Sequence, residues 1–250
     1  MKIKSILVSQ PEPANGKSHY AELASKNHLK IDFQPFIHIE GIPGKVFRKE
    51  RINLLEHTAV ILTSKTAIDN FFRIAIEMRV SVPDSMKYFC VTESVAHYLQ
   101  KYTVYRKRTI FFGKGKFPDL MGLISKNKDE KFLIPLSDMH KNDIPLLLKE
   151  AKINFTKAVI YKTVCSDLSH LSAKKYDILV FFSPTGITSL LHNFPDFEQN
   201  GTKIACFGPS TAKAVTDAGL RLDIQVPNPK SPSMTMALEQ FITDYNKNHK

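Results

Sequence analysis

Short apolar runs recur along the chain, and polar or amphipathic stretches separate them. A run of four to six apolar residues bounded by turn residues is typical of a buried strand. The runs that predict strands are 5–9, 57–62, 88–91, 109–112, 131–135, 157–161, 178–182, 203–207 and 222–226. Most of the intervening stretches have a helical period, for example 143–151 and 211–218. Strands that alternate with helices in this way predict βαβ units with parallel sheets, so the expected fold class is α/β.

A weak internal repeat divides these elements into two sets. VILTSKTAIDNFF (60–72) resembles VFFSPTGITSLL (180–191), and similar pairs follow in the same order. Those pairs are 88–99 with 204–215, 111–121 with 225–235, 131–137 with 5–11, and 155–162 with 33–40. The repeat predicts two similar lobes. It leaves open whether each lobe is one half of the sequence, or whether the chain leaves one lobe and returns to it through 33–40 and 155–162.

Hydroxyl residues follow four of the predicted strands, each at the start of a predicted helix. The loops are Thr63-Ser64-Lys65-Thr66, Thr92-Glu93-Ser94, Ser183-Pro184-Thr185-Gly186 and Gly208-Pro209-Ser210-Thr211. Ligands of open parallel sheets bind at the carboxyl ends of the strands, and the N–H groups of a first helical turn attract anions. We therefore expect an anion-binding cleft lined by both lobes, with Gly186 and Gly208 allowing a ligand close to the backbone. The alternative for each loop is an ordinary helix cap.

Charge and composition narrow the class of ligand. The formal charge of +11 on 250 residues favours an acidic partner. No P-loop, GxSxG or HExxH pattern is present, Asp138 and His140 fit a polar loop, and no nucleic-acid-reading module is recognisable. We expect no metal, no nucleic acid and, without an apolar run of about 20 residues, no membrane span.

The three cysteines, Cys90, Cys165 and Cys206, form no CxxC pair, which indicates reduced thiols in a cytoplasmic protein. Cys90 and Cys206 lie within apolar runs and are expected in the core.

Several of these segments resemble the uroporphyrinogen-III synthase family. FFSPTGITSLL (181–191) is similar to the family's Phe-Ser-Pro-Ser strand end, and the segment 204–238 is similar to its Ile-Gly-Pro-Thr-Thr-Ala motif and the helix, strand and Pro-rich entry that follow. AVIYKT (158–163) resembles the Val-Tyr-Arg-Thr connector, and VILTSKTAIDNFF resembles the Thr-Ser motif of the other lobe. The likeness spans nearly the whole chain and is strongest after residue 158.

The resemblance implies two flavodoxin-like lobes with parallel sheets, of about five strands each, joined by a two-stranded connector. It selects the arrangement in which the chain returns to its first lobe. One lobe would comprise 1–36 plus 163–250, and the other 40–158. The connectors would be 34–40 and 157–163.

The resemblance also implies an activity. The family's lyases cyclise hydroxymethylbilane, a linear tetrapyrrole polycarboxylate, to uroporphyrinogen III, with inversion of the terminal ring and loss of water. This step of heme biosynthesis needs no cofactor, and a monomer is expected. Tyr161 is the expected proton donor to the departing hydroxyl. The expected substrate-binding residues are Thr63, Ser64, Lys65, Ser94, Ser183, Pro184, Thr185, Gly186, Gly208, Pro209, Ser210 and Thr211.

Three departures from the family pattern keep an alternative function open. Ser9-Gln10-Pro11 replaces Thr-Arg-Pro, Leu136-Ser137-Asp138 replaces an arginine-containing loop, and Thr92-Glu93-Ser94-Val95 replaces Gly-x-x-Thr. The missing arginines would weaken carboxylate binding, which Lys65 would offset. The alternative is a non-catalytic bilobed protein that binds an anionic tetrapyrrole or a similar metabolite.

Overall fold

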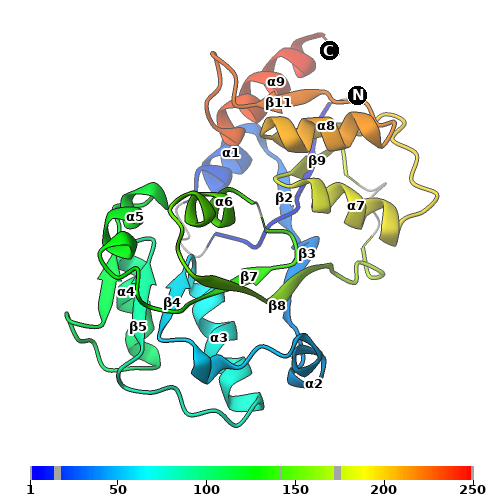
Figure 1. Cartoon of the computed structure of the whole chain (residues 1–250). Coiled ribbons are helices and arrows are strands. Elements are labelled where there is room, and N and C mark those ends of the chain that lie inside the picture. The colour runs from blue at the N-terminus through cyan, green and yellow to red at the C-terminus, as the bar shows by residue number, and fades with distance from the viewer. Residues whose placement is uncertain (1, 14–17, 141, 172–175, 249–250) are drawn as a thin grey trace. The chain divides into compact units, whose positions relative to one another are not determined.

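The computed structural model describes residues 2–13, 18–140, 142–171 and 176–248. The chain divides into two compact units (Figure 1). The first unit contains residues 1–38 and 164–250, and the second contains residues 39–163. The chain therefore leaves the first unit after residue 38 and returns to it at residue 164.

The first unit is built on a five-stranded sheet with the order β11-β10-β9-β1-β2. Its strands are β1 (Ser5–Val8), β2 (Lys30–Phe33), β9 (Ile178–Phe181), β10 (Lys203–Phe207) and β11 (Ile224–Val226). The neighbours pair in parallel. Side chains alternate between the two faces of each strand, so Ile6 and Val180 pack on one side while Leu7 and Leu179 pack on the other.

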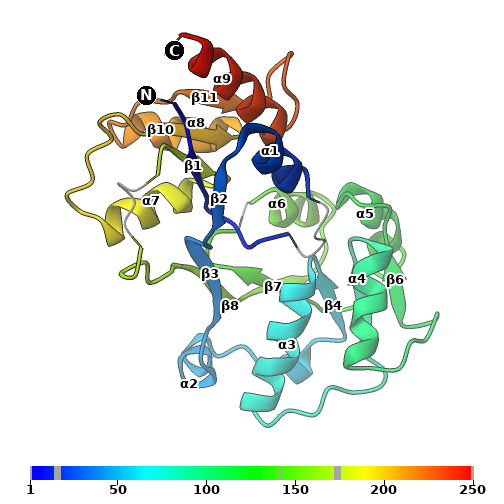
Figure 2. The ribbon, with the colours of Figure 1, turned by 180° about the vertical axis from the view of Figure 1, so that it is seen from behind.

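Helices cover both faces of this sheet (Figures 1 and 2). One face carries α1 (His19–Asn27) and α9 (Met234–Asn248), whose Leu23 and Leu238 share a core with β1 and β9. The other face carries α7 (Pro184–Asn193) and α8 (Pro209–Asp217), which pack side by side. Both faces are therefore buried, as a parallel sheet requires.

The second unit has a six-stranded sheet with the order β3-β8-β7-β4-β5-β6. Its strands are β3 (Ile37–Gly41), β4 (Ala59–Leu62), β5 (Lys87–Cys90), β6 (Ile110–Phe112), β7 (Phe132–Ser137) and β8 (Phe155–Cys165). One face packs against α2 (Gly44–Phe47), α3 (Lys65–Glu77) and α4 (Glu93–Tyr98). The other face packs against α5 (Pro118–Ser125) and α6 (Asp143–Glu150). The 3₁₀ turns are η1 (Arg48–Glu50), η2 (Leu54–Glu56) and η3 (Leu99–Lys101).

The sheet orders bear out four of the five pairs of the internal repeat. The fifth pair, 155–162 with 33–40, is not borne out, because β8 has the sheet position of β2 rather than of 33–40. The repeat pairs β4 with β9, β5 with β10, β6 with β11 and β7 with β1. Reading the second sheet from its far edge as β6-β5-β4-β7-β8 then gives the same order as β11-β10-β9-β1-β2 in the first. The two units thus share one doubly wound topology, and the α/β fold predicted from the sequence is confirmed.

Every predicted strand corresponds to a strand of the structure, but two edge strands differ from expectation. The pattern analysis did not predict β2, whose Lys30 and Asp32 form an ion pair at the edge of the first sheet. The segment 33–40, predicted as a connector, contains β3, which is hydrogen-bonded beside β8 at the edge of the second sheet. Edge strands carry a weak apolar signal because one side of each lacks a neighbour.

The cysteine and membrane predictions can be checked directly. Cys90 and Cys206 are buried, and burial raises the pKa of the Cys90 thiol to about 12 and that of Cys206 to about 11. Both are core residues, as predicted. Within the described part of the chain, every helix is too short or too polar to cross a bilayer.

Helix α3 offers a matched test of the buried face. Ile74 is fully buried, whereas Ile76, two residues along the same helix, is 74% exposed. We expect Ile74→Ala to lower the free energy of unfolding by about 2–5 kcal/mol because it leaves a cavity. Ile76→Ala should change it by less than about 0.5 kcal/mol. Urea denaturation measures both, and equal effects would contradict the packing described for α3.

Candidate functional site

In the second unit, Ser64 forms the N-terminal cap of α3. Its hydroxyl accepts a hydrogen bond from the Ala67 N–H at 3.1 Å, and its backbone is extended. The neighbouring Lys65 is exposed, and its ammonium lies over the Tyr98 ring at 5.3 Å from the centroid. A cation and the N–H groups of the first turn of α3 therefore lie together just past the end of β4.

Tyr161 lies at the same edge of this sheet, beside Ser64. Strand β8 pairs in parallel with β7, and Tyr161 is opposite Ser137, the last residue of β7. The side chain is buried, and the Ser64 hydroxyl is near enough to the phenol to influence its pKa. Burial raises the pKa of the phenol, and the Ser64 hydroxyl opposes this shift by a smaller amount. The phenol is therefore protonated at neutral pH and able to donate a proton.

A β-bulge explains why Tyr161 faces α3. Leu136 is opposite Val159 and Ser137 is opposite Tyr161, so Ile160 is an extra residue in β8. In a regular strand Ile160 and Tyr161 would point to opposite faces. Both instead belong to the core on the α3 side of the sheet. Bulges redirect side chains in this way, and they are common next to functional sites.

The loop after β7 is used to hold β8 in place. The Asp138 carboxylate accepts hydrogen bonds from the Thr163 N–H at 3.1 Å and the Met139 N–H at 2.9 Å. The Asp138 N–H in turn donates to the Tyr161 carbonyl at 3.1 Å. His140 contacts the Ser137 carbonyl through Nδ1 at 2.8 Å. Asp138 and His140 therefore stabilise this loop by hydrogen bonds, as expected from the sequence.

The loop after β5 is capped in the same way as the loop after β4. Thr92 accepts from the Val95 N–H at 3.2 Å, and the exposed Ser94 hydroxyl lies 3.3 Å from that of Thr92. Glu93 is exposed, and its carboxylate is 3.6 Å from the His97 ring. Ser94 is therefore the hydroxyl of this loop that remains accessible to a ligand.

In the first unit, Ser183 caps α7 by accepting from the Gly186 N–H at 3.2 Å, and Pro184 occupies the first turn. Thr185 is half-buried, while Gly186 is buried. A Cβ on Gly186 would lie 3.2 Å from the Phe181 ring and 3.9 Å from the Ser9 hydroxyl. The expectation that Gly186 admits a ligand is not supported by this packing, because its open side is filled by the protein's own side chains.

Helix α8 begins differently from α3, α4 and α7. Gly208 has φ +88°, a left-handed conformation that favours glycine, and no side chain caps the helix. Pro209 and Ser210 are exposed, but Thr211 is only 1% exposed. The expected side-chain contact of Thr211 with a ligand therefore needs correction, since its hydroxyl lies inside the fold. The backbone of this first turn and the exposed Ser210 side chain are the parts of the motif that a ligand can reach.

The structure adds two features of the first unit that the sequence analysis did not predict. A pocket of about 400 Å³ lies at the N-terminal ends of α1 and α9 and is lined by Pro13, Ser18, His19, Tyr20, Ser233, Met234 and Thr235. Ser18 caps α1 through the Ala21 N–H. The sequence signal that could have indicated this feature is Ser-Pro-Ser at 231–233, directly before α9, because serine and proline are common where a helix begins.

The second feature is an aromatic pair. Phe182 follows β9 and Phe207 ends β10, so both lie at the carboxyl edge of the sheet. Their rings stack with centroids 6.2 Å apart, and Phe207 is 39% exposed. An exposed aromatic surface beside two helix N-termini suits a ligand that combines flat rings with carboxylates.

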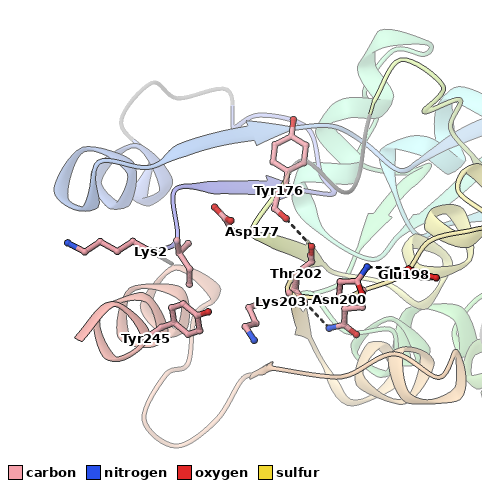
Figure 3. A pocket seen from close by; sticks show the side chains of 11 residues that line it. Lys2, Tyr176, Asp177, Glu198, Asn200, Thr202, Lys203 and Tyr245 are labelled. Carbon is pink, nitrogen blue, oxygen red and sulfur yellow. Dashed lines mark hydrogen bonds between the residues drawn. The ribbon is translucent and has the colours of Figure 1, made fainter. Parts of the chain in front are cut away.

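A further pocket of about 330 Å³ lies at the opposite edge of the first sheet (Figure 3). Its lining includes Asp177, just before β9, and Lys203, the first residue of β10. The Asp177 carboxylate accepts from the Lys4 and Ser5 N–H groups, and Lys203 lies 3.7 Å from Asp223 and over the Tyr245 ring. These groups are bonded to one another and to the backbone where the strands begin, at the edge opposite the helix N-termini. This pocket is therefore not the candidate site.

Among the described residues, no cluster of three or more His, Cys, Asp or Glu side chains is arranged to hold a metal ion. The candidate groups in each unit are instead hydroxyls and helix N-termini, together with Lys65 and Tyr161 in the second unit.

Comparison with known proteins places the chain in a family. The pattern of the uroporphyrinogen-III synthase HemD family matches residues 18–236. No curated protein matches the chain. Among solved structures, uroporphyrinogen-III synthetase from Helicobacter pylori is similar, with 18% identity and a TM-score of 0.55 over 96% of this chain and 99% of the other.

A mutant uroporphyrinogen III synthase from Thermus thermophilus is similar at 13% identity, with a TM-score of 0.51 over 98% of this chain and 99% of the other. At these identities the two structures support the fold. The family pattern covers most of the sequence, and the protein belongs to the uroporphyrinogen-III synthase HemD family.

Proposed function

We propose that this protein is a uroporphyrinogen-III synthase, a lyase that cyclises hydroxymethylbilane to uroporphyrinogen III with inversion of the terminal ring and loss of water. Membership of an enzyme family of heme biosynthesis supports the proposal. The observation that carries it is the buried Tyr161 phenol at the carboxyl edge of the sheet, near Ser64 at the N-terminus of α3. A proton donor near a helix N-terminus suits a reaction on an anionic substrate, which supports the proposal.

Substrate binding rests on the helix N-termini at the carboxyl edge of each sheet. Each of the four substrate rings carries an acetate and a propionate, and the formal charge of +11 attracts such a polyanion. The Ser64 and Ser183 hydroxyls already accept cap hydrogen bonds. We therefore assign carboxylate binding chiefly to the backbone N–H groups of α3, α7 and the uncapped α8. Lys65, Ser94, Thr185 and Ser210 are the side chains that add to them.

The apolar part of the substrate requires a different surface. A pyrrole ring is flat, and the stacked rings of Phe182 and Phe207 offer it an aromatic contact at the edge of the first sheet. Held between aromatic and N–H contacts, the chain of rings would be restricted to few conformations. Restriction of shape is the main requirement for this reaction, because the reactive ends lie in the same molecule.

Tyr161 supplies the proton that the first step needs. The C–O bond of the hydroxymethyl group breaks as the phenol protonates the oxygen, and water leaves. The Ser64 hydroxyl stabilises the resulting phenolate. For the ring to invert, the freed methylene carbon first bonds to the terminal-ring carbon that already carries the neighbouring methylene. That older carbon–carbon bond then breaks, and its methylene bonds to the other α-carbon of the ring, which closes the macrocycle. The proton lost from this α-carbon restores the phenol. The overall step therefore loses one water and needs no external acid or base.

The activity itself is tested by supplying freshly prepared hydroxymethylbilane and separating the product isomers. We expect the type III isomer, formed faster than the spontaneous type I isomer. Tight tetrapyrrole binding with only type I product, at the rate seen without protein, would instead identify a non-catalytic binding protein.

Replacement of the proton donor should affect the chemical step. We expect Tyr161→Phe to lower kcat for type III formation by about 10²-fold or more, the usual loss when a general acid is removed. Because burial raises the pKa of Tyr161, the proton-donating form should persist to at least about pH 10, and kcat should not fall with Tyr161 ionisation at neutral pH.

Tyr88→Phe is the matched control, since Tyr88 is a buried tyrosine of the same core. It should leave kcat unchanged, with both variants folded by circular dichroism. Full activity of Tyr161→Phe would remove Tyr161 from the mechanism.

Gly208 tests binding by the first turn of α8. A side chain at φ +88° is strained by about 1–2 kcal/mol, so Gly208→Ala should shift the turn and its N–H groups. We expect KM to rise between about 2-fold and 30-fold, the equivalent of one helix-terminus interaction with an anion. Gly201→Ala is the control, because Gly201 lacks a positive φ and has open space around it. Equal KM values for the two variants would argue against a role for α8.

A further inference from the structure

The Arg73 side chain, on α3, is fully engaged by hydrogen bonds within the second unit. Its Nε donates to the Asn70 side chain at 3.0 Å, and its Nη1 donates to Glu77. Its Nη2 donates to two carbonyls, Ile42 at 3.0 Å and Ile160 at 2.9 Å. In a protein for a polycarboxylate, an arginine beside the site suggests a substrate contact. Here every nitrogen of the guanidinium already has a partner.

One of those partners is the carbonyl of the β-bulge. Ile160 is the extra residue of β8, so its carbonyl lies where the regular pairing with β7 is interrupted. It accepts hydrogen bonds from Arg73 and from the Ile42 N–H at 2.9 Å. This carbonyl belongs to the peptide group that joins Ile160 to Tyr161. Its orientation therefore sets the direction in which the Tyr161 side chain leaves the strand.

The other end of the network reaches the first turn of α3. Asn70, which accepts from Arg73, donates through Nδ2 to the Thr66 carbonyl at 3.0 Å. Thr66 is two residues after Ser64, which is near the Tyr161 phenol. The hydrogen bonds thus connect the peptide before Tyr161 to the helix turn beside which the phenol lies.

Gly41 provides the space that this arrangement needs. A Cβ at this position would lie 2.4 Å from both Cζ and Nε of Arg73. Gly41 is not among the glycines with positive φ, so its backbone does not demand glycine. Any side chain at residue 41 would displace the guanidinium. Because the arginine end is flexible, we expect the displacement to move Arg73 and to leave the strand in place.

Glu77 holds the guanidinium from the far side. Its carboxylate accepts from Arg73 and from the Gly44 N–H, and these two contacts lower the pKa of the carboxyl, with the Gly44 hydrogen bond the larger cause. Glu77 is therefore ionised at neutral pH and remains a partner for the arginine.

We propose that Arg73 is a positioning residue for Tyr161: it holds the bulge at Ile160 on helix α3 and thereby keeps the phenol beside Ser64. The proposal deepens the proposed function and depends on Tyr161 taking part in the reaction. Arg73 itself touches no substrate. A lysine cannot replace it, since a single ammonium cannot direct donors to Asn70, Ile42 and Ile160 at once.

Arg73→Lys and Gly41→Ala test the kinetic consequence. We expect both to lower kcat for type III formation by about 10-fold to 100-fold, the effect of a misplaced catalytic group, with KM changed by less than about 2-fold. A raised KM with normal kcat would instead mean that Arg73 binds the substrate, and would overturn the proposal. Gly122→Ala is the control, because a Cβ at Gly122 would have nothing within 4 Å.

A double variant tests whether Gly41 acts through Arg73. Arg73→Met keeps the aliphatic stem but removes the donors. If the methyl group at residue 41 acts by displacing the guanidinium, Gly41→Ala should lower kcat no further in the Arg73→Met protein. Additive losses would contradict the proposal, because they would mean that the two residues act independently.

A titration of Tyr161 separates this proposal from the proposed function. The absorbance of phenolate, taken as the difference between each protein and its Tyr161→Phe counterpart, gives the pKa of Tyr161 without any assay of activity. We expect Gly41→Ala, which retains the Arg73 charge, to move this pKa down toward about 10, the value for a solvated tyrosine. An unchanged pKa would overturn the positioning role even if Tyr161 proves catalytic. A lowered pKa with a fully active Tyr161→Phe would remove Tyr161 from the mechanism and leave the positioning intact.

Discussion

Apart from β3, the strands of both sheets are paired in parallel, so the carboxyl ends of neighbouring strands lie along one edge, and the helices that follow begin there. Peptide dipoles add up along each helix, and the resulting positive end faces the same edge as the unpaired N–H groups of the first turn. Ser64, Thr92 and Ser183 satisfy some of these N–H groups, and α8 has no side-chain cap. Each unit therefore presents an edge suited to carboxylates without any arginine in the family's usual positions.

Chemistry at such an edge depends on placing one proton donor accurately. A phenol is a weak acid, and burial makes Tyr161 weaker still, so it serves only a leaving group held in position. The bulge at Ile160 and the Arg73 network together account for that position. They also explain an arginine that looks available in the sequence but is used entirely for structure.

The glycines near the site illustrate how one residue type serves different physical needs. Gly208 adopts a left-handed backbone, Gly186 packs against Phe181, and Gly41 leaves room for the Arg73 guanidinium. Only the first of these follows from backbone conformation. At the other two positions, the need for glycine comes from a neighbour that is close in space. In sequence, Phe181 is 5 residues from Gly186, and Arg73 is 32 residues from Gly41.

The sequence by itself determined the buried strands and their repetition in two similar units, because hydrophobic period and helix-start residues are local properties. The buried strands, the caps at Ser64 and Ser183, the core cysteines and the repeat could all be predicted in this way. Tertiary structure alone decided that β3 joins a sheet, that Thr211 is buried and that Gly186 faces Phe181. Tertiary structure also decided which face of the sheet Tyr161 lies on. Regular alternation along 157–161 predicts that Tyr161 and Ile160 point to opposite faces. The bulge, whose Ile160 carbonyl is bonded by the distant Arg73, instead brings both side chains to the same face. Such contacts depend on how the chain packs in space, so no local sequence pattern predicts them.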